Sequence, residues 1–233
     1  MVKKLLLVAI AAFSGLVADA QIAVNRGGVS PRSTDESGEK VNTFAYKFGV
    51  KAGVNFSSMS NNENNIDPNF SMGTGFRVGG LVNLRWGQRT ENSLPGTGWF
   101  GLQPEVMYSY MQYGTDADNL QMHAIQVPAM LKIYPTAQLS FEVGPEFTYI
   151  MSTSPSDMTI TGSQNATGAN TYNSVQLKTG DVGGLTVGIG GGVAYDFDMG
   201  LTIGARYSYG FTKMAKNLDW KASNIQVSVG WLF

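Results

Sequence analysis

The chain has 233 residues, enough for one sizeable domain, and its 16 Lys and Arg against 17 Asp and Glu give a net charge of −1. This balance offers no basic tract for a nucleic-acid partner, and the absence of cysteine excludes disulfides and thiolate metal sites. Charged residues make up only 14% of the chain, against roughly 25% in typical soluble domains, which disfavours a soluble globular surface.

The N-terminus has the three parts of an export signal. Two lysines precede the apolar stretch Leu5–Val17, and an A-x-A pattern ends at Ala20. We predict a signal peptide over residues 1–20, cleaved after Ala20. The alternative, a transmembrane anchor, needs an apolar run of roughly 20 residues. Residues 21–43 are polar and are predicted to form a flexible periplasmic leader or a short partner-binding tail.

From residue 44 onward, apolar and polar residues alternate in eight segments. In the first, every second residue from Phe44 to Phe56 is apolar and those between are small or polar. A period of two places the two sets on opposite faces of a β-strand. Most segments reach the roughly 9–11 residues that cross a bilayer. The predicted strands are Phe44–Ser57, Gly75–Trp86, Trp99–Tyr113, Met122–Tyr134, Gln138–Met151, Gly184–Phe197, Leu201–Thr212 and Asn224–Phe233.

The connections between these segments alternate in length. Tyr134–Gln138 and Phe197–Leu201 are tight turns, whereas Gly87–Gly98 is long for its set. The long polar connections are Ser58–Gly73, Gly114–Gln121, Ser152–Gly183 and Lys213–Ser223. Short turns at one end and long extracellular loops at the other are typical of outer-membrane barrels. We therefore predict that residues 44–233 are one all-β domain, an eight-stranded antiparallel up-and-down transmembrane β-barrel.

Alternation alone also fits a soluble, lipocalin-like barrel with an apolar lumen. The polar face favours the membrane alternative, because it is mostly Gly, Ser, Thr and Asn with a few charges of both signs. Such charges can neutralise one another inside a narrow lumen, and Lys47 and Asp196 share their face. The predicted lumen charge network comprises Lys51, Arg77, Arg85, Glu105, Lys132, Glu142, Glu146 and Arg206.

Aromatic residues near the strand ends predict two interfacial girdles. The girdle at the short-turn end comprises Phe44, Tyr46, Trp86, Trp99, Phe100, Tyr134, Phe197, Trp231 and Phe233, and the girdle at the long-loop end comprises Tyr108, Tyr110, Tyr149, Tyr207, Tyr209 and Phe211. The sequence ends in mid-alternation with Trp231 and Phe233. A final strand that ends in Phe resembles the signal by which outer-membrane barrels are recognised for insertion.

Five segments together resemble the PorT-like outer-membrane β-barrel family: FGVKAGVNFS, GLQPEVMYSY, IQVPAMLKIY, VGPEFTY and the terminal VSVGWLF. The resemblance runs from Phe44 to the end and implies a small integral barrel of the OmpA/OmpX type in a Gram-negative envelope. Such barrels are often grouped with porins, and the namesake of the family is linked to protein secretion, but no motif here carries that role. Pro104, Pro128 and Pro145 lie inside strands and are predicted to mark bulges.

No catalytic, cofactor or metal site is predicted. The single histidine, His123, falls on the side of Ile125 and therefore on the lipid or interface side. Glu142 and Glu146 are about 13 Å apart along one strand, too far for a carboxylate dyad, although Glu105 could approach either of them. The run Gly188–Gly192 lacks the Lys-Ser/Thr of a nucleotide loop and is better explained by strand curvature.

These observations predict a non-enzymatic outer-membrane protein with a structural or surface-interaction role, chiefly through the loop Ser152–Gly183. The expected partners are outer-membrane lipid, the barrel-assembly machinery and an envelope or extracellular protein. The alternatives are a narrow porin-like channel, an accessory of a secretion apparatus, and a lipid-modifying or proteolytic barrel that would use His123. An eight-stranded barrel is just filled by its side chains, which disfavours a wide pore.

Overall fold

The structure, a computed structural model, describes residues 44–61, 72–87, 98–114, 119–154, 157–166, 169–178, 184–212 and 220–233. The predicted signal peptide, the leader and most of the long connections lie outside these residues. The strands of the described part are β1 (Ala45–Asn61), β2 (Gly73–Trp86), β3 (Phe100–Gly114), β4 (Asn119–Ile133), β5 (Leu139–Ser154), β6 (Asp157–Ala166), β7 (Ala169–Lys178), β8 (Gly184–Asp196), β9 (Leu201–Gly210) and β10 (Trp220–Leu232). None of the described residues forms a helix long and apolar enough to cross a membrane.

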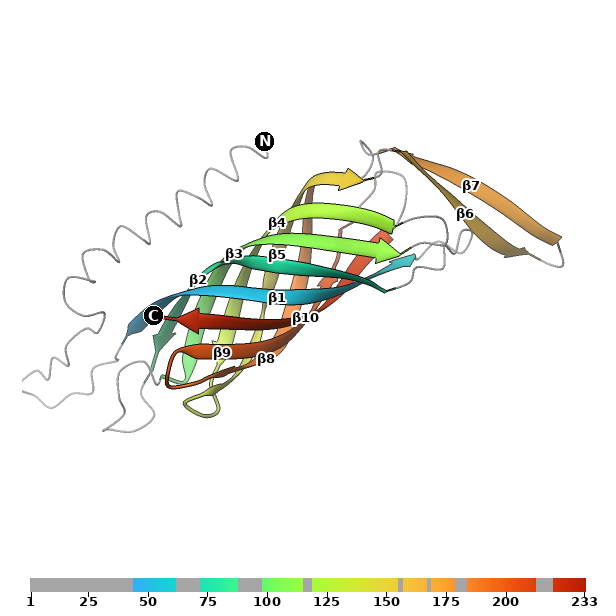
Figure 1. Ribbon diagram of the computed structural model, residues 1–233. Coiled ribbons are helices and arrows are strands. Elements are labelled where there is room, and N and C mark those ends of the chain that lie inside the picture. Colours follow the sequence, from blue (N-terminus) through green and yellow to red (C-terminus); the bar gives the residue numbers. More distant parts are fainter. Residues whose placement is uncertain are drawn as a thin grey trace, which may run out of the picture.

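Eight of these strands close into one antiparallel barrel in the order β1-β10-β9-β8-β5-β4-β3-β2 (Figure 1). The barrel closes because β1 pairs with β2 on one side and with β10 on the other, from Gly49 opposite Leu232 to Asn61 opposite Trp220. Closure leaves no strand edge of the barrel unpaired, which is the condition for a sheet to exist in lipid. The predicted fold is confirmed.

The strands extend beyond their predicted ends, mainly at the long-loop end. There β1 runs four residues past Ser57, β10 begins four residues before Asn224, and β4 begins three residues before Met122. The added residues are mostly Ser, Asn, Gln and Met. A strand that leaves the hydrocarbon layer no longer needs an apolar face, so its alternation fades while its backbone pairing continues.

The three strand prolines do not mark bulges, contrary to the sequence prediction. The register between β2 and β3 is the same on both sides of Pro104, and the register between β4 and β5 is the same on both sides of Pro128. Pairing also continues in one register through Pro145. Proline removes one ladder hydrogen bond without adding a residue, so it interrupts pairing locally and leaves the alignment intact. The register shift of β4 against β5 lies at His123 and Ala124 instead.

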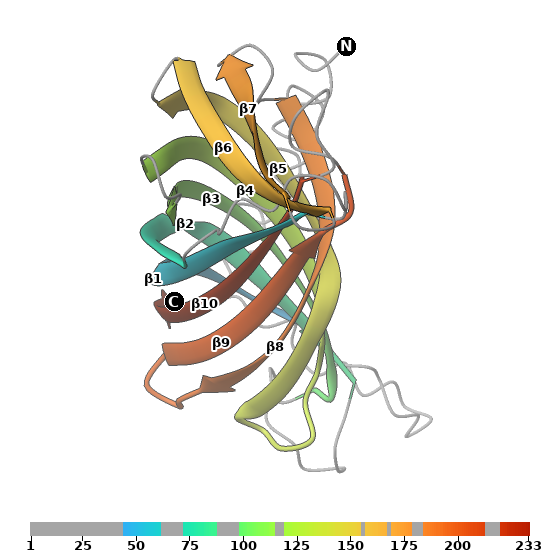
Figure 2. The same ribbon diagram turned by 90° about the vertical axis from the view of Figure 1, so that its right-hand side faces the viewer.

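The connection Ser152–Gly183 contains structure that the sequence analysis missed. β6 and β7 form a two-stranded antiparallel ribbon of ten residues each, with Asp157 opposite Lys178 and Ala166 opposite Ala169. Figures 1 and 2 show this ribbon at the end of the barrel opposite the C-terminus. The long-loop end of the barrel therefore carries a β-ribbon that pairs with none of the described barrel strands.

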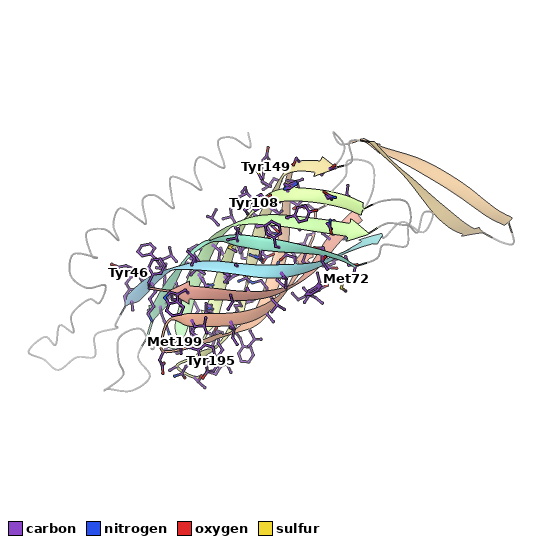
Figure 3. The ribbon with its side chains drawn as sticks, in the orientation of Figure 1. Tyr46, Met72, Tyr108, Tyr149, Tyr195 and Met199 are labelled. Carbon is purple, nitrogen blue, oxygen red and sulfur yellow. The ribbon has the colours of Figure 1, made fainter. Side chains whose placement is uncertain are left out.

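The apolar face of the sheet points outward and the polar face points into the lumen. Figure 3 shows apolar and aromatic side chains projecting from the outside of the barrel. Exposed side chains include Val50, Val54, Phe76, Val143, Ile203 and Val229, and buried ones include Lys51, Asn55, Arg77, Glu105, Gln126 and Arg206. This distribution is the reverse of a soluble barrel and excludes the lipocalin-like alternative.

One residue of the predicted girdles lies on the wrong side. Tyr134 is 1% exposed and sits inside the barrel, not at the membrane interface. It follows the outward-facing Ile133, so the same alternation that turns Lys132 inward also turns Tyr134 inward. At this strand end, the alternation of the residues predicts which way Tyr134 points better than its aromatic character does.

Candidate functional site

The centre of the lumen is organised around one carboxylate, Glu105 of β3, whose side chain is 0% exposed. Its Oε1 lies 2.5 Å from Lys51 Nζ and 2.9 Å from Arg206 Nη2, and its Oε2 lies 3.4 Å from Arg77 Nη2. Gln103 Nε2 also donates to Oε1 at 2.7 Å. Three cations from three other strands therefore converge on a single buried anion.

Arg206 of β9 connects this anion to two further carboxylates. Its Nε donates to Glu142 Oε1 at 2.7 Å, and its Nη1 lies 3.3 Å from Glu146 Oε1. The six residues Lys51, Arg77, Glu105, Glu142, Glu146 and Arg206, which we call the ion-pair layer, carry three positive and three negative charges. The layer is therefore formally neutral, as a set of charges removed from water must be to remain stable.

A glycine of β8 provides the space for this arrangement. A Cβ atom at Gly190 would lie 2.8 Å from Glu146 Oε1 and 3.2 Å from Met130 Cε. The absence of a side chain at Gly190 therefore lets the Glu146 carboxylate lie against the β8 backbone. Within the glycine run of β8, Gly190 makes room for the ion-pair layer and Gly188 and Gly192 let the β9 backbone approach closely, which explains the run better than a nucleotide loop does.

A second polar cluster lies towards the short-turn end, around Tyr134. The Tyr134 hydroxyl accepts from Asn83 Nδ2 at 2.9 Å and donates to Asp196 Oδ2 at 3.2 Å. Lys132 Nζ lies 3.8 Å from the same Asp196 oxygen. We call Asn83, Arg85, Lys132, Tyr134 and Asp196 the end cluster.

Arg85 is held in the end cluster by the backbone and by an aromatic ring. Its Nε donates to the carbonyl of Gly98 at 2.6 Å, and its Nη1 donates to the carbonyl of Ala137 at 3.0 Å. Its guanidinium carbon lies 3.6 Å from the centre of the Tyr134 ring, in cation–π geometry. Gln103 joins the two clusters, because its Oε1 accepts from Lys132 at 3.0 Å while its amide nitrogen donates to Glu105.

The structure thus divides the eight residues of the predicted network. Six lie in the ion-pair layer, whereas Arg85 and Lys132 lie in the end cluster. Sequence analysis placed Asp196 on the polar face but left it out of the network, and it assigned Tyr134 to the girdle. Alternation along the chain could have identified both, because Asp196 occupies an inward position of β8 and Tyr134 continues the inward positions of β4 one residue past its end.

Two small cavities adjoin the ion-pair layer among the described residues. One cavity, lined by Lys51, Arg77, Glu142 and Arg206 among others, has a volume of about 10 Å³. A second, at the long-loop side and lined in part by Gln126, Glu146 and Asn224, has about 40 Å³. A single water needs roughly 10–15 Å³, so these spaces suit a few waters and no larger solute. Among the described residues, no group of His, Asp and Glu could hold a metal ion.

The final strand places the two residues of the predicted insertion signal at the barrel surface. Trp231 and Phe233 are exposed, and the backbone N–H of Phe233 donates to the carbonyl of Phe48 at 2.8 Å. The residues of the predicted signal therefore lie in the segment that closes the barrel.

A closed eight-stranded barrel with an apolar exterior and a sealed, charged interior defines the class of small transmembrane β-barrels. Residues 39–216 match the family described as "Outer membrane protein beta-barrel domain", and the chain belongs to this family. Its place is the outer membrane. No curated protein matches the chain.

Three solved structures align with most of this chain. Neisserial surface protein A is 13% identical with a TM-score of 0.47, over 80% of this chain and 97% of that one. Ail, the attachment invasion locus protein of Yersinia pestis, is 11% identical with a TM-score of 0.44, over 81% and 99%. The outer membrane enzyme PagL is 11% identical with a TM-score of 0.41, over 78% and 98%.

Proposed function

We propose that this chain is a non-enzymatic, PorT-like outer-membrane protein that binds an envelope or extracellular protein partner through its extracellular loops. The observation that carries the proposal is the β6–β7 ribbon, which extends from the long-loop end of the barrel (Figure 1). A two-stranded ribbon is only marginally stable by itself, and its outer backbone groups can pair with a further strand. A partner would supply the contacts that the ribbon lacks.

The ion-pair layer supports a structural role for the barrel itself and disfavours the channel alternative. The side chains that meet at Glu105 come from β1, β2, β3 and β9, so they connect opposite walls of the lumen. The two cavities that adjoin the layer have volumes of about 10 and 40 Å³. We expect the purified barrel in planar bilayers to show no step conductance. Regular single-channel steps from a preparation with heat-modifiable migration would contradict this expectation.

The route to the membrane is also part of the proposal. Residues 1–20 act as a signal peptide that is cleaved after Ala20, residues 21–43 remain as a periplasmic leader, and the barrel-assembly machinery recognises Trp231 and Phe233. Mass spectrometry of the mature protein would give an N-terminus at Gln21 if this is correct. A mature N-terminus at Met1 would contradict the cleavage.

Site-specific crosslinking in intact cells tests the partner proposal. The chain has no cysteine, so one cysteine can be introduced as the sole attachment point for a crosslinker. We would place it at Asn165 in the ribbon and, as the matched control, at Met199, an exposed turn residue at the opposite end of the barrel. A discrete adduct from Asn165 that Met199 does not give is expected. Equal labelling of the two positions, or none, would contradict a ribbon partner.

A further inference from the structure

On the mostly apolar outer face of the barrel, β3, β4 and β5 carry one group of linked polar side chains near the long-loop end. Tyr108 Oη lies 2.6 Å from His123 Nδ1, and the ring centres of Tyr110 and His123 are 5.1 Å apart. Gln112 Nε2 donates to Tyr110 Oη at 2.8 Å. These side chains are all partly exposed on the outer face. They require an explanation, because a girdle tyrosine needs neither a histidine nor an amide partner.

A β-bulge adds a serine to this group. Ala124 pairs with Ile150, but its neighbour His123 pairs with Ser152, so Met151 is the extra residue of β5. Directly opposed residues of an antiparallel pair place their side chains on the same face. The bulge thus sets Ser152, which is exposed, beside His123 on the outer face. Bulges often re-aim a side chain in this way at functional sites.

The position of the group along the strands sets its depth in the membrane. Tyr108 and Tyr110 follow Phe100, a residue of the short-turn girdle, by eight and ten positions. At about 3.4 Å per residue and a strand tilt of about 40°, this corresponds to roughly 21–26 Å along the membrane normal. The apolar band of such barrels is about 25 Å tall. The group therefore lies where the outer-leaflet hydrocarbon meets the lipid headgroups.

The group offers hydrogen-bond donors to that layer. When the Tyr108 hydroxyl donates to Nδ1, the neutral imidazole of His123 carries its proton on Nε2. Nε2–H and the Ser152 hydroxyl can then both donate, and the group contains no carboxylate. Oxygen atoms that bear negative charge are the strongest acceptors for such donors. At this depth, those oxygens belong to lipid phosphate.

We propose that Tyr108, Tyr110, Gln112, His123 and Ser152 form a binding site for the phosphate of an outer-leaflet lipid. In this site His123 and Ser152 bind the phosphate, Tyr108 fixes the histidine ring, and Gln112 and Tyr110 form the adjoining wall. The site lies on the outside of the barrel and is independent of the loop partner. In this proposal the single histidine binds a lipid and has no catalytic role.

The single histidine also provides the test, because its imidazole resonances report on this site alone. The full barrel in a phosphate-free maltoside detergent would be titrated with dihexanoyl phosphatidic acid, with dihexanoyl glycerol and with inorganic phosphate. We expect a saturable shift of the His123 ring resonances with phosphatidic acid alone. An equal shift with dihexanoyl glycerol would show contact with any lipid, and saturation by inorganic phosphate at the same concentration would show a site for the free ion. Either result overturns the proposal.

Single substitutions separate the site from the girdle. Tyr108→Phe and Ser152→Ala should each weaken phosphatidic acid binding about tenfold, since each removes a hydrogen bond that positions or contacts a charged group. The matched control is Tyr207→Phe, at an exposed girdle tyrosine of β9. It should leave the affinity unchanged, and heat-modifiable migration checks that every variant is folded. Unchanged affinity in Tyr108→Phe and Ser152→Ala, or release of hexanoate during the titration, would overturn the proposal.

Discussion

The two polar clusters of the lumen neutralise buried charge in different ways. In the ion-pair layer, formal charges meet formal charges, and Glu105 contacts three cations. In the end cluster, Arg85 is satisfied by two backbone carbonyls and a ring, and Lys132 by an amide, with Asp196 3.8 Å away. A buried charge whose partners are side chains, such as Glu105, loses them when those residues are substituted. A buried charge whose partners are backbone carbonyls, such as Arg85, keeps them, because a substitution does not remove the backbone.

The largest effect is expected at the centre of the ion-pair layer. Glu105→Gln keeps the shape of the side chain but leaves Lys51, Arg77 and Arg206 around a neutral amide. Removing one partner of a buried ion pair typically costs about 3–5 kcal/mol, and we expect a loss of that size in the free energy of unfolding. Urea unfolding in lipid vesicles, followed by tryptophan fluorescence, would measure it. A second substitution, Arg77→Met, should restore part of the loss, and a change below about 1 kcal/mol in Glu105→Gln would contradict this account.

A comparable but pH-dependent effect is expected at the other end of the same layer. Arg206→Met leaves Glu142 and Glu146 without their common cation and should cost about 3 kcal/mol at pH 7. Unlike unpaired cations, unpaired carboxylates can become neutral by binding protons. The difference in unfolding free energy between wild type and variant should therefore shrink as the pH is lowered from 7 to 4. A difference that stays constant over this range would contradict the assigned contacts.

A smaller loss is expected in the end cluster. Lys132→Met removes a cation whose nearest carboxylate oxygen, on Asp196, lies 3.8 Å away and whose closest partner is the Gln103 amide. Its free energy of unfolding should fall by about 1–2 kcal/mol, the cost of losing a hydrogen bond to a charged donor. The same urea titration applies. If Lys132→Met lowered the free energy of unfolding as much as Glu105→Gln does, the end cluster would depend on ion pairs as strongly as the ion-pair layer, which would contradict this comparison.

The smallest effect is expected for Tyr134→Phe. This change removes the hydroxyl that contacts Asn83 and Asp196 but keeps the ring under Arg85. The expected cost is about 1 kcal/mol, as for one typical hydrogen bond. Tyr134→Leu removes the ring as well and is the control for the cation–π contact. Equal stability of the two variants would show that the ring contributes nothing.

Alternation in the sequence was sufficient to predict the fold and which residues enter the lumen, because period-two patterning and burial have the same physical origin. It could not predict which charges meet. Lys132 and Glu142 stand opposite each other on neighbouring strands, yet Lys132 contacts Gln103 and Glu142 contacts Arg206. Contacts across the lumen depend on how the closed sheet is staggered, and no single strand encodes that.

The sequence did not predict two features, because the apolar signal at each of them is too short to stand out from a polar loop. The β6–β7 ribbon is rich in Thr, Ser, Asn and Gln, and its alternating apolar positions are confined to one short stretch, where Met158 pairs with Leu177 and Ile160 with Val175. Because Met151 is an extra residue of β5, His123 pairs with Ser152 and not with Met151. Only the pairing of the two strands shows this. Both features lie at or beyond the membrane boundary. There the strands face water and do not need the apolar outer face by which strands are recognised in the sequence.

The seam between β1 and β10 joins the first strand of the barrel to the last. The barrel cannot close until β10 pairs with β1, and the bond from the Phe233 N–H to the Phe48 carbonyl lies at the end of that seam. Because a chain is synthesised from its N-terminus, β1 is complete before β10 exists, and until then its edge can pair with other strands. During the interval between the synthesis of β1 and that of β10, the chain must be kept from pairing with other proteins.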